Sequence, residues 1–246
     1  MRKFVTDALV IWQMQAMKTR RWLPVYVFSI VLVPIGTLLF AKALIPEGMV
    51  TPEVETRLVT GSLVFGIGIM TVNNLAQIFL WERFGGMLRL IITAPVRPMA
   101  YASGIILYAL TQGMFTAAVL LSFAPLLGID VHLDLWLVPV LALTSLSLAG
   151  LGIVIATWSP RMEVGNLLAN VAGIMAGLLS PIYYPIERLP AWLQWVVRAS
   201  PYTHAGQAVG DILAGRGGFM QETLILFALT ALGLTLGVAG LRWRER

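Results

Sequence analysis

Long runs of apolar residues, separated by short polar segments, dominate the chain. A membrane-spanning helix needs about 20 consecutive apolar residues. The pattern therefore predicts an all-α integral membrane protein, organised as a single transmembrane domain over residues 1–246. Six spans are expected after an N-terminal segment, at residues 22–44, 58–80, 101–127, 135–157, 164–184 and 219–241.

Residues 1–21 have a different pattern from the spans. Apolar residues recur there at helical spacing, namely Phe4, Val5, Ala8, Leu9 and Trp12. The basic residues around them are Arg2, Lys3, Lys18, Arg20 and Arg21. A basic amphipathic helix of this kind lies in the headgroup plane of a membrane. The segment is expected to be an interfacial helix, with a solvated tail as the alternative.

Composition supports the membrane assignment. Hydrophobic residues make up 58% of the chain and charged residues only 12%, whereas soluble domains average about 25% charged residues. The absence of cysteine excludes disulfides, thiol chemistry and cysteine-based metal sites. The net charge of +5 does not require a nucleic-acid partner, because basic residues near span ends are the usual orientation signal.

The distribution of basic residues predicts that both termini are cytoplasmic. With that orientation, 12 of the 17 basic residues lie on the inner side, as the positive-inside rule requires. These inner residues are Arg2, Lys3, Lys18, Arg20, Arg21, Arg83, Arg89, Arg97, Arg161, Arg242, Arg244 and Arg246. The expected location is the cell (plasma or inner) membrane.

A charged stretch, residues 82–96, lies between the second and third expected spans and must therefore face the cytoplasm. Its pattern predicts a short helix held parallel to the membrane, with Gly85-Gly86 allowing a break and Pro95 and Pro98 ending the unit. Such an element is suited to docking on a soluble partner. A plain helical hairpin with charged anchors is the equally weighted alternative.

This stretch resembles the cytoplasmic signature of ABC-2 type transporter permeases, the family that includes daunorubicin-resistance, nodulation-factor and polysaccharide export permeases. The residues that carry the resemblance are Glu82, Arg83, Gly86, Leu88, Ile91, Pro95 and Val96. The chain departs from the family pattern at Met87, where threonine is usual, and at Ala94, with Thr93 one place early.

A second block after the fifth expected span also resembles the family, and includes a short outer helix expected after Pro190. Its matching residues are Pro185, Leu189, Pro190, Leu193, Pro201, Leu213 and Gly215. An arginine often found before the last element is replaced by Gly210 and Asp211. The resemblance extends from the amphipathic start to the basic tail.

The resemblance implies a half-transporter that pairs with a second permease copy or a sister permease and rests on two copies of a separate ATPase subunit. The helix over residues 82–90 would be the coupling helix. Glu82 and Arg83 would make charge contacts with the ATPase, and Leu88 and Ile91 would seat the helix in its groove. Arg161 and Glu163 would form a second inner contact, or a tight turn with one anchoring charge pair.

Small and polar residues inside the spans are candidates for the dimer interface and the transport path. Those of the fifth span are Gly165, Asn166, Ala169, Asn170, Gly173 and Gly177, and those of the second are Asn73, Asn74 and Gln77. A stripe of small residues lets helices pack closely in lipid, so packing within one subunit is the alternative for the first set. The amides would either line a polar vestibule or bond between helices.

The function expected from these observations is export of a lipophilic or amphipathic substrate, such as a drug or lipid. No Walker-type phosphate loop is present, so ATP and Mg²⁺ would be bound by the partner and the chain itself would need no cofactor or metal. Export of a polysaccharide or lipid-linked glycan is the alternative, and a membrane scaffold is a remote one. An intramembrane enzyme is disfavoured, because Ser145 and Ser180 have no histidine near them in the sequence.

Overall fold

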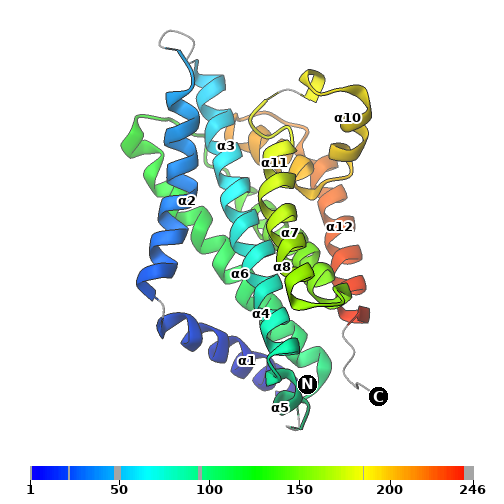
Figure 1. The fold of residues 1–246 in the computed structure, drawn as a ribbon. Helices are drawn as coiled ribbons and strands as arrows, with labels where there is room; N and C mark the ends of the chain where they lie inside the picture. Colours follow the sequence, from blue (N-terminus) through cyan, green and yellow to red (C-terminus); the bar gives the residue numbers. More distant parts are fainter. Residues whose placement is uncertain (1, 22, 47–50, 94–95, 185, 241–246) are drawn as a thin grey trace.

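The computed structural model describes the chain apart from residues 1, 22, 47–50, 94–95, 185 and 241–246. All regular structure in this described part is helical, as the sequence predicts. The long helices run side by side, with α1 and α5 at one end of the molecule and α10 at the other (Figure 1). We name these the α5 end and the α10 end.

The elements follow one another with short connections. Their bounds are α1 (Arg2–Arg21), α2 (Leu23–Ala43), α3 (Pro52–Gly68), the π-helical turn η1 (Ile69–Asn73), α4 (Asn74–Phe84), α5 (Met87–Thr93), α6 (Pro98–Phe123), the 3₁₀ turn η2 (Pro125–Leu127), α7 (Leu137–Trp158), α8 (Met162–Asn170), the π-helical turn η3 (Val171–Met175), α9 (Ala176–Leu179), the 3₁₀ turn η4 (Ile186–Arg188), α10 (Ala191–Arg198), α11 (Pro201–Leu213) and α12 (Phe219–Gly240).

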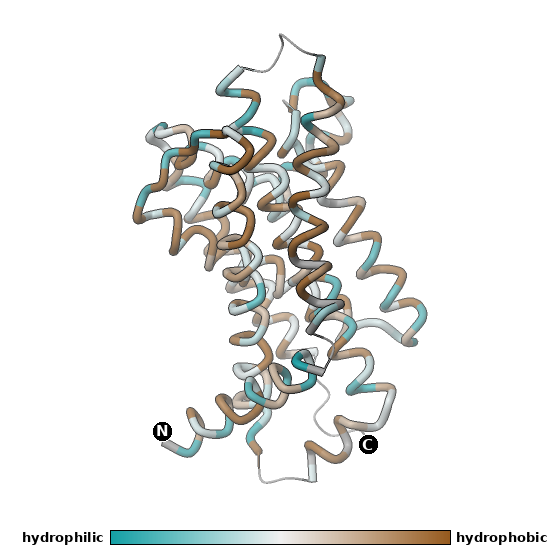
Figure 2. The backbone as a smooth tube through the Cα atoms, turned by 90° about the vertical axis from the view of Figure 1, so that its left-hand side faces the viewer, coloured by the Kyte–Doolittle hydropathy of each residue, from teal (hydrophilic) through white to brown (hydrophobic). Residues whose placement is uncertain are grey.

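Among the residues that the structure describes, five helical stretches are long and apolar enough to cross a membrane, and each overlaps one of the expected spans after the first. They are Pro52–Phe84, Pro98–Leu127, Leu137–Trp158, Met162–Leu179 and Phe219–Gly240. The remaining expected span, residues 22–44, coincides with α2, an apolar helix of 21 residues. Hydrophobic residues dominate the long helices in Figure 2, and the described chain is thus a membrane protein.

The second span begins six residues earlier than its apolar pattern predicts, at Pro52 instead of residue 58. The side chain of Thr51 caps the helix by accepting a hydrogen bond from the backbone N–H of Val54 at 3.3 Å. Proline is favoured at the first helical position, and Glu53 and Glu55 in the first turn complement the helix dipole. These local signals extend the helix into its polar flank.

The fifth span ends earlier than expected, with α9 stopping at Leu179 instead of residue 184. Proline disfavours the helical conformation in the residue before it, and here Pro181 follows Ser180. The apolar residues beyond this point, including Ile182, pack into the bundle as an irregular segment.

Two buried clusters form the interior. The first lies toward the α10 end and includes Leu63, Leu148 and Val209; the second lies toward the α5 end and includes Ile11 and Leu80. Helices α6 and α7 contribute to both clusters, so they connect the two ends of the molecule.

Helix α11 was not expected from the sequence, which indicated only one short helix between residues 185 and 218. That short helix is present as α10, and α11 follows it and packs against α3, α7 and α12. Its buried residues recur at helical spacing and include Tyr202, Ala205, Val209 and Ile212. This spacing was a readable signal for a second helix.

Candidate functional site

The chain turns sharply between α4 and α5, inside the stretch expected to dock on a partner. Helix α4 ends where the backbone N–H of Gly85 donates to the carbonyl of Trp81 at 2.8 Å. Gly86 then adopts φ of +82°, a left-handed conformation that costs other residues roughly 1–2 kcal/mol. Helix α5 therefore begins at once and packs against α4.

Because of this conformation, we expect Gly86→Ala to lower the free energy of unfolding by about 1 kcal/mol. The measurement is the thermal unfolding of the purified chain in detergent. Gly217→Ala is the matched control, because Gly217 has no atom near its added Cβ and no positive φ. Equal stability of the two variants would contradict the strain assigned to Gly86.

Glu82 is buried near the end of α4, with 4% of its surface exposed. Its Oε1 accepts hydrogen bonds from Gln15 Nε2 at 2.6 Å and from Lys18 Nζ at 2.8 Å, both on α1. Its Oε2 accepts a hydrogen bond from the hydroxyl of Tyr101 on α6. A buried carboxylate must be paired and hydrogen-bonded to be tolerated, and here three donors from two other helices meet that need.

Arg83 points to a third helix. Its Nη1 donates to the carbonyl oxygens of Ala156, Thr157 and Ser159, at 3.1, 3.0 and 2.9 Å. These carbonyls lie at the end of α7, where the last four of a helix lack intrahelical partners. A cation at this position is also favoured by the helix dipole.

We name Glu82, Arg83 and these partners the α4 anchor, because they bind the end of α4 to α1, α6 and α7. Glu82, which was expected to make a charge contact with another subunit, is buried in this subunit. Its carboxylate is already occupied by three donors of the same chain. The charged pair of the motif serves internal attachment in this structure.

The apolar residues at the end of α4 and in α5 divide into an inner and an outer group. Ile91 is buried and Leu88 packs beside it against the cluster at the α5 end. The sequence placed both residues against a partner, whereas in this subunit they face the interior. The outer group is Trp81, Phe84 and Leu90, which expose 62%, 41% and 67% of their surface. The sequence pattern did not reveal this outer group. Pro95, which was also expected to belong to the docking element, lies outside the described residues.

The second expected inner contact lies next to the α4 anchor. Arg161 stands at the N-cap position of α8 and Glu163 in its first turn, where a carboxylate complements the helix dipole. Both side chains are exposed. The bond from Arg83 to Ser159 holds this loop beside the turn between α4 and α5.

One pair of the amides expected in the second and fifth spans bonds between helices, and a third amide supports it from within the second span. Asn73 Nδ2 donates to Asn170 Oδ1 at 2.8 Å, and Gln77 Nε2 donates to Asn73 Oδ1 at 2.8 Å. Asn74 makes only a weak contact with the sulfur of Met70. The π-helical turns η1 and η3 also contact each other here, and such turns are frequent at functional sites.

The small residues of the fifth span pack within the subunit, which is the alternative that the sequence analysis kept open for them. Gly165, Ala169, Gly173 and Gly177 are all buried. An added Cβ on Gly165 would lie 2.5 Å from Leu80, and one on Gly177 would lie 2.6 Å from a ring atom of Phe65. The stripe therefore lets α8, η3 and α9 approach the second span closely.

Beside this stripe, Asn166 is half-buried and its Oδ1 has no hydrogen-bond partner within the described structure. Asn170 lies on the exposed side of the helix. The outer face of the fifth span is apolar, with Leu167, Val171 and Met175 exposed.

A cavity of about 570 Å³ lies between α1 and α4, next to the α4 anchor. Its walls combine polar side chains with one large aromatic ring; they are Gln15, Lys18, Asn74, Gln77, Ile78, Trp81 and Glu82. The described residues offer no cluster of three or more histidine, aspartate or glutamate side chains for a metal ion.

Comparison with known families agrees with this arrangement. The family profile of ABC-2 type transporters matches residues 7–214, which extend from α1 past the end of α11 and include the α4 anchor. No curated protein matches the sequence. Membrane domains of this family are transport permease components that normally work with an ATPase partner. The chain belongs to the ABC-2 type transporter family.

Proposed function

We propose that this chain is the permease subunit of an ATP-driven exporter for a lipophilic or amphipathic substrate, such as a drug or lipid. Two copies of a separate ATPase bind at the α5 end, and a second permease copy or a sister permease completes the transporter. The α5 end faces the cytoplasm, together with both termini, in the cell membrane. The substrate leaves the cytoplasm or the inner leaflet.

The observation that carries this proposal is an exposed apolar surface on a firmly attached element. Trp81, Phe84 and Leu90 are exposed at the turn between α4 and α5, while Glu82 and Arg83 attach the same turn to three helices. Closely packed protein interiors transmit displacement instead of absorbing it. A partner that moves α5 therefore moves α1, α6 and α7 with it.

The orientation is supported by the charges at the α5 end. Lys18, Arg20, Arg83 and Arg161 lie on elements at this end of the molecule, and basic residues are enriched on the cytoplasmic side of membrane proteins. An ATPase that uses cytoplasmic ATP must meet the permease on that side.

The substrate class is supported by the cavity between α1 and α4. A volume of about 570 Å³ is within the range of pockets for small molecules. Lys18, Gln77 and Asn74 give polar contacts on its wall, and the Trp81 ring is exposed beside them. An amphipathic molecule would place its polar group against these side chains and its apolar part along the ring.

The test is reconstitution of the full chain in lipid nanodiscs with an ATPase encoded next to its gene. We expect co-purification and permease-dependent ATP hydrolysis. Leu90→Asp should reduce binding by at least about tenfold, because apolar anchors of interfaces often contribute 2 kcal/mol or more. Because Leu90 is 67% exposed in the isolated subunit, the thermal unfolding of the Leu90→Asp variant should match that of wild type.

Leu135→Asp is the matched control. Leu135 is 87% exposed and precedes α7 at the opposite end, so this variant should bind the ATPase like wild type. If Leu90→Asp bound the ATPase as well as Leu135→Asp, α5 would not be the docking element. If the folded wild-type chain bound no such ATPase, the exporter assignment would yield to the scaffold alternative.

A further inference from the structure

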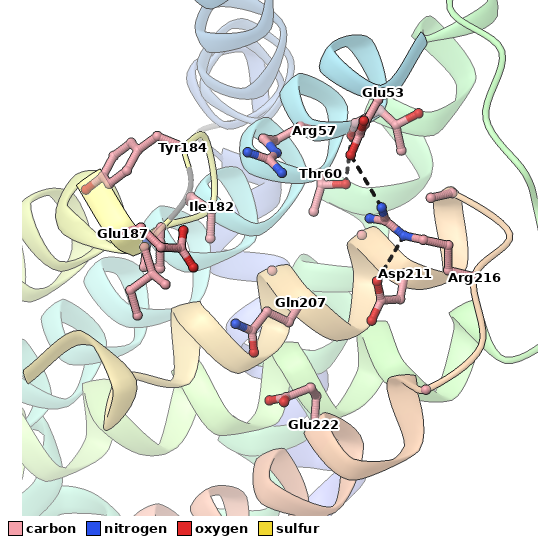
Figure 3. Close-up of a pocket in the computed structure, with 17 residues that line it drawn as sticks. Glu53, Arg57, Thr60, Ile182, Tyr184, Glu187, Gln207, Asp211, Arg216 and Glu222 are labelled. Carbon is pink, nitrogen blue, oxygen red and sulfur yellow. Dashed lines mark hydrogen bonds and ion pairs between the residues drawn. The ribbon is translucent and has the colours of Figure 1, made fainter. Parts of the chain in front are cut away.

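A second cavity, of about 470 Å³, lies at the α10 end (Figure 3). It is bordered by the first turns of α3, residues 181–184 and 186–187, helix α11 and the start of α12. Charged side chains line much of it. They are Glu53, Arg57, Glu187, Asp211, Arg216 and Glu222.

Most of these charges are paired within the protein. Arg216 contacts Asp211 at 3.3 Å and Glu53 at 3.5 Å. Glu222 contacts His204 Nδ1 at 2.6 Å. These pairs leave little capacity for a ligand at one side of the cavity.

Arg57 and Glu187 are different. Figure 3 shows their side chains directed into the same space, Arg57 from α3 and Glu187 from η4. Neither forms an ion pair with any residue of the described chain. The cavity thus presents a guanidinium and a carboxylate that form no ion pair with each other, and both line the space that one bound molecule would occupy.

The cavity lies where a membrane span ends. Arg57 stands in the second turn of the span Pro52–Phe84. Tyr184 lines the cavity, and Trp192 and Trp195 are exposed on α10 at the same end. Tyrosine and tryptophan mark the headgroup level of a bilayer, so the cavity is at the depth of lipid headgroups.

We propose that this cavity binds a phosphoethanolamine group, with Arg57 on the phosphate and Glu187 on the ammonium. A guanidinium fork matches phosphate oxygens, and a free carboxylate accepts hydrogen bonds from a primary ammonium. The group is carried either by a membrane lipid or by a small soluble molecule. This assignment is independent of ATPase docking at the α5 end.

The charge balance of the cavity favours a ligand that carries an ammonium group. Four carboxylates line the cavity against two arginines. Burial raises the pKa of Asp211, and the neighbouring Glu222 raises it further, although Arg216 opposes both effects. A purely anionic ligand would add to this excess of negative charge.

The test uses the purified full chain in detergent, titrated by calorimetry with three probes. These are a short-chain phosphatidylethanolamine, a short-chain phosphatidylglycerol and free phosphoethanolamine. We expect saturable binding of the first probe that weakens about tenfold in Arg57→Gln and in Glu187→Gln. Phosphatidylglycerol should bind more weakly and should not respond to Glu187→Gln.

The matched controls are Arg188→Gln and Asp130→Asn, exposed residues that do not line the cavity. Both should bind like wild type. Free phosphoethanolamine binding as tightly as the lipid would identify a soluble source, and binding of the lipid alone would identify the bilayer. No saturable binding of either, or equal losses in the control variants, would overturn the proposal while leaving ATPase coupling untouched.

Discussion

Glu82→Ala is expected to destabilise the α5 end by on the order of 3 kcal/mol, because buried donors lose their acceptor. Gln15 and Tyr101 expose 2% and none of their surface, so neither donor is freely solvated once the carboxylate is removed. Lys18, with 45% of its side chain exposed, can be solvated and should add little. The measurement is thermal unfolding in detergent, together with hydrogen exchange of the amides of α1.

Two variants sharpen this prediction. Glu82→Gln keeps an oxygen acceptor at the same place and should recover part of the loss. Glu163→Ala removes an exposed carboxylate at the same end and should be close to wild type. Unchanged unfolding and unchanged α1 exchange in Glu82→Ala would show that the α4 anchor does not hold α1.

Gly104→Leu is expected to separate α1 from α6. A Cβ at Gly104 would lie 2.6 Å from the carbonyl oxygen of Ala8 and 2.6 Å from Cβ of Ile11, so α1 must move away. Overpacking of this kind costs about 1–3 kcal/mol. Tryptic cleavage within α1, at Lys18 or Arg20, should therefore become roughly tenfold faster.

Gly36→Leu is the control for this experiment. Gly36 lies in α2, and no atom is within 4 Å of its added Cβ, so cleavage of α1 should keep its wild-type rate. Equal rates in the two leucine variants would mean that the contact between α1 and α6 does not protect α1.

The sequence predicted the membrane-spanning helices well because lipid imposes a simple rule. Every span after the first overlaps an apolar helix of sufficient length. The ends were less accurate, because capping by Thr51 and the break at Pro181 are decided by local backbone chemistry and not by hydropathy. The docking of a partner at α5 and the membrane crossing by residues 22–44 stay predictions.

The sequence predicted a break at Gly85-Gly86 in the candidate site, but it could not show which residues of the same subunit its side chains contact. Glu82 meets Gln15, which is 67 positions away in the sequence, and no periodicity within residues 82–96 can reveal such a contact. The inward direction of Leu88 and Ile91 likewise depends on the packing of α5 against its neighbours. Leu90 emerged as the exposed residue only from the fold.

The π-helical turn η1 has a further consequence for the direction of the α4 anchor. A π-turn contains one residue more than the α-helical turn it replaces, and one residue corresponds to about 100° around a helix. Beyond Asn73, α4 is therefore rotated by about that angle relative to a continuous helix from α3. Glu82 faces α1 and Arg83 faces α7 because of a backbone irregularity more than two turns away. The two halves of the longest span therefore turn different sides toward the interior. Helix α3 packs into the cluster at the α10 end, and α4 packs into the cluster at the α5 end.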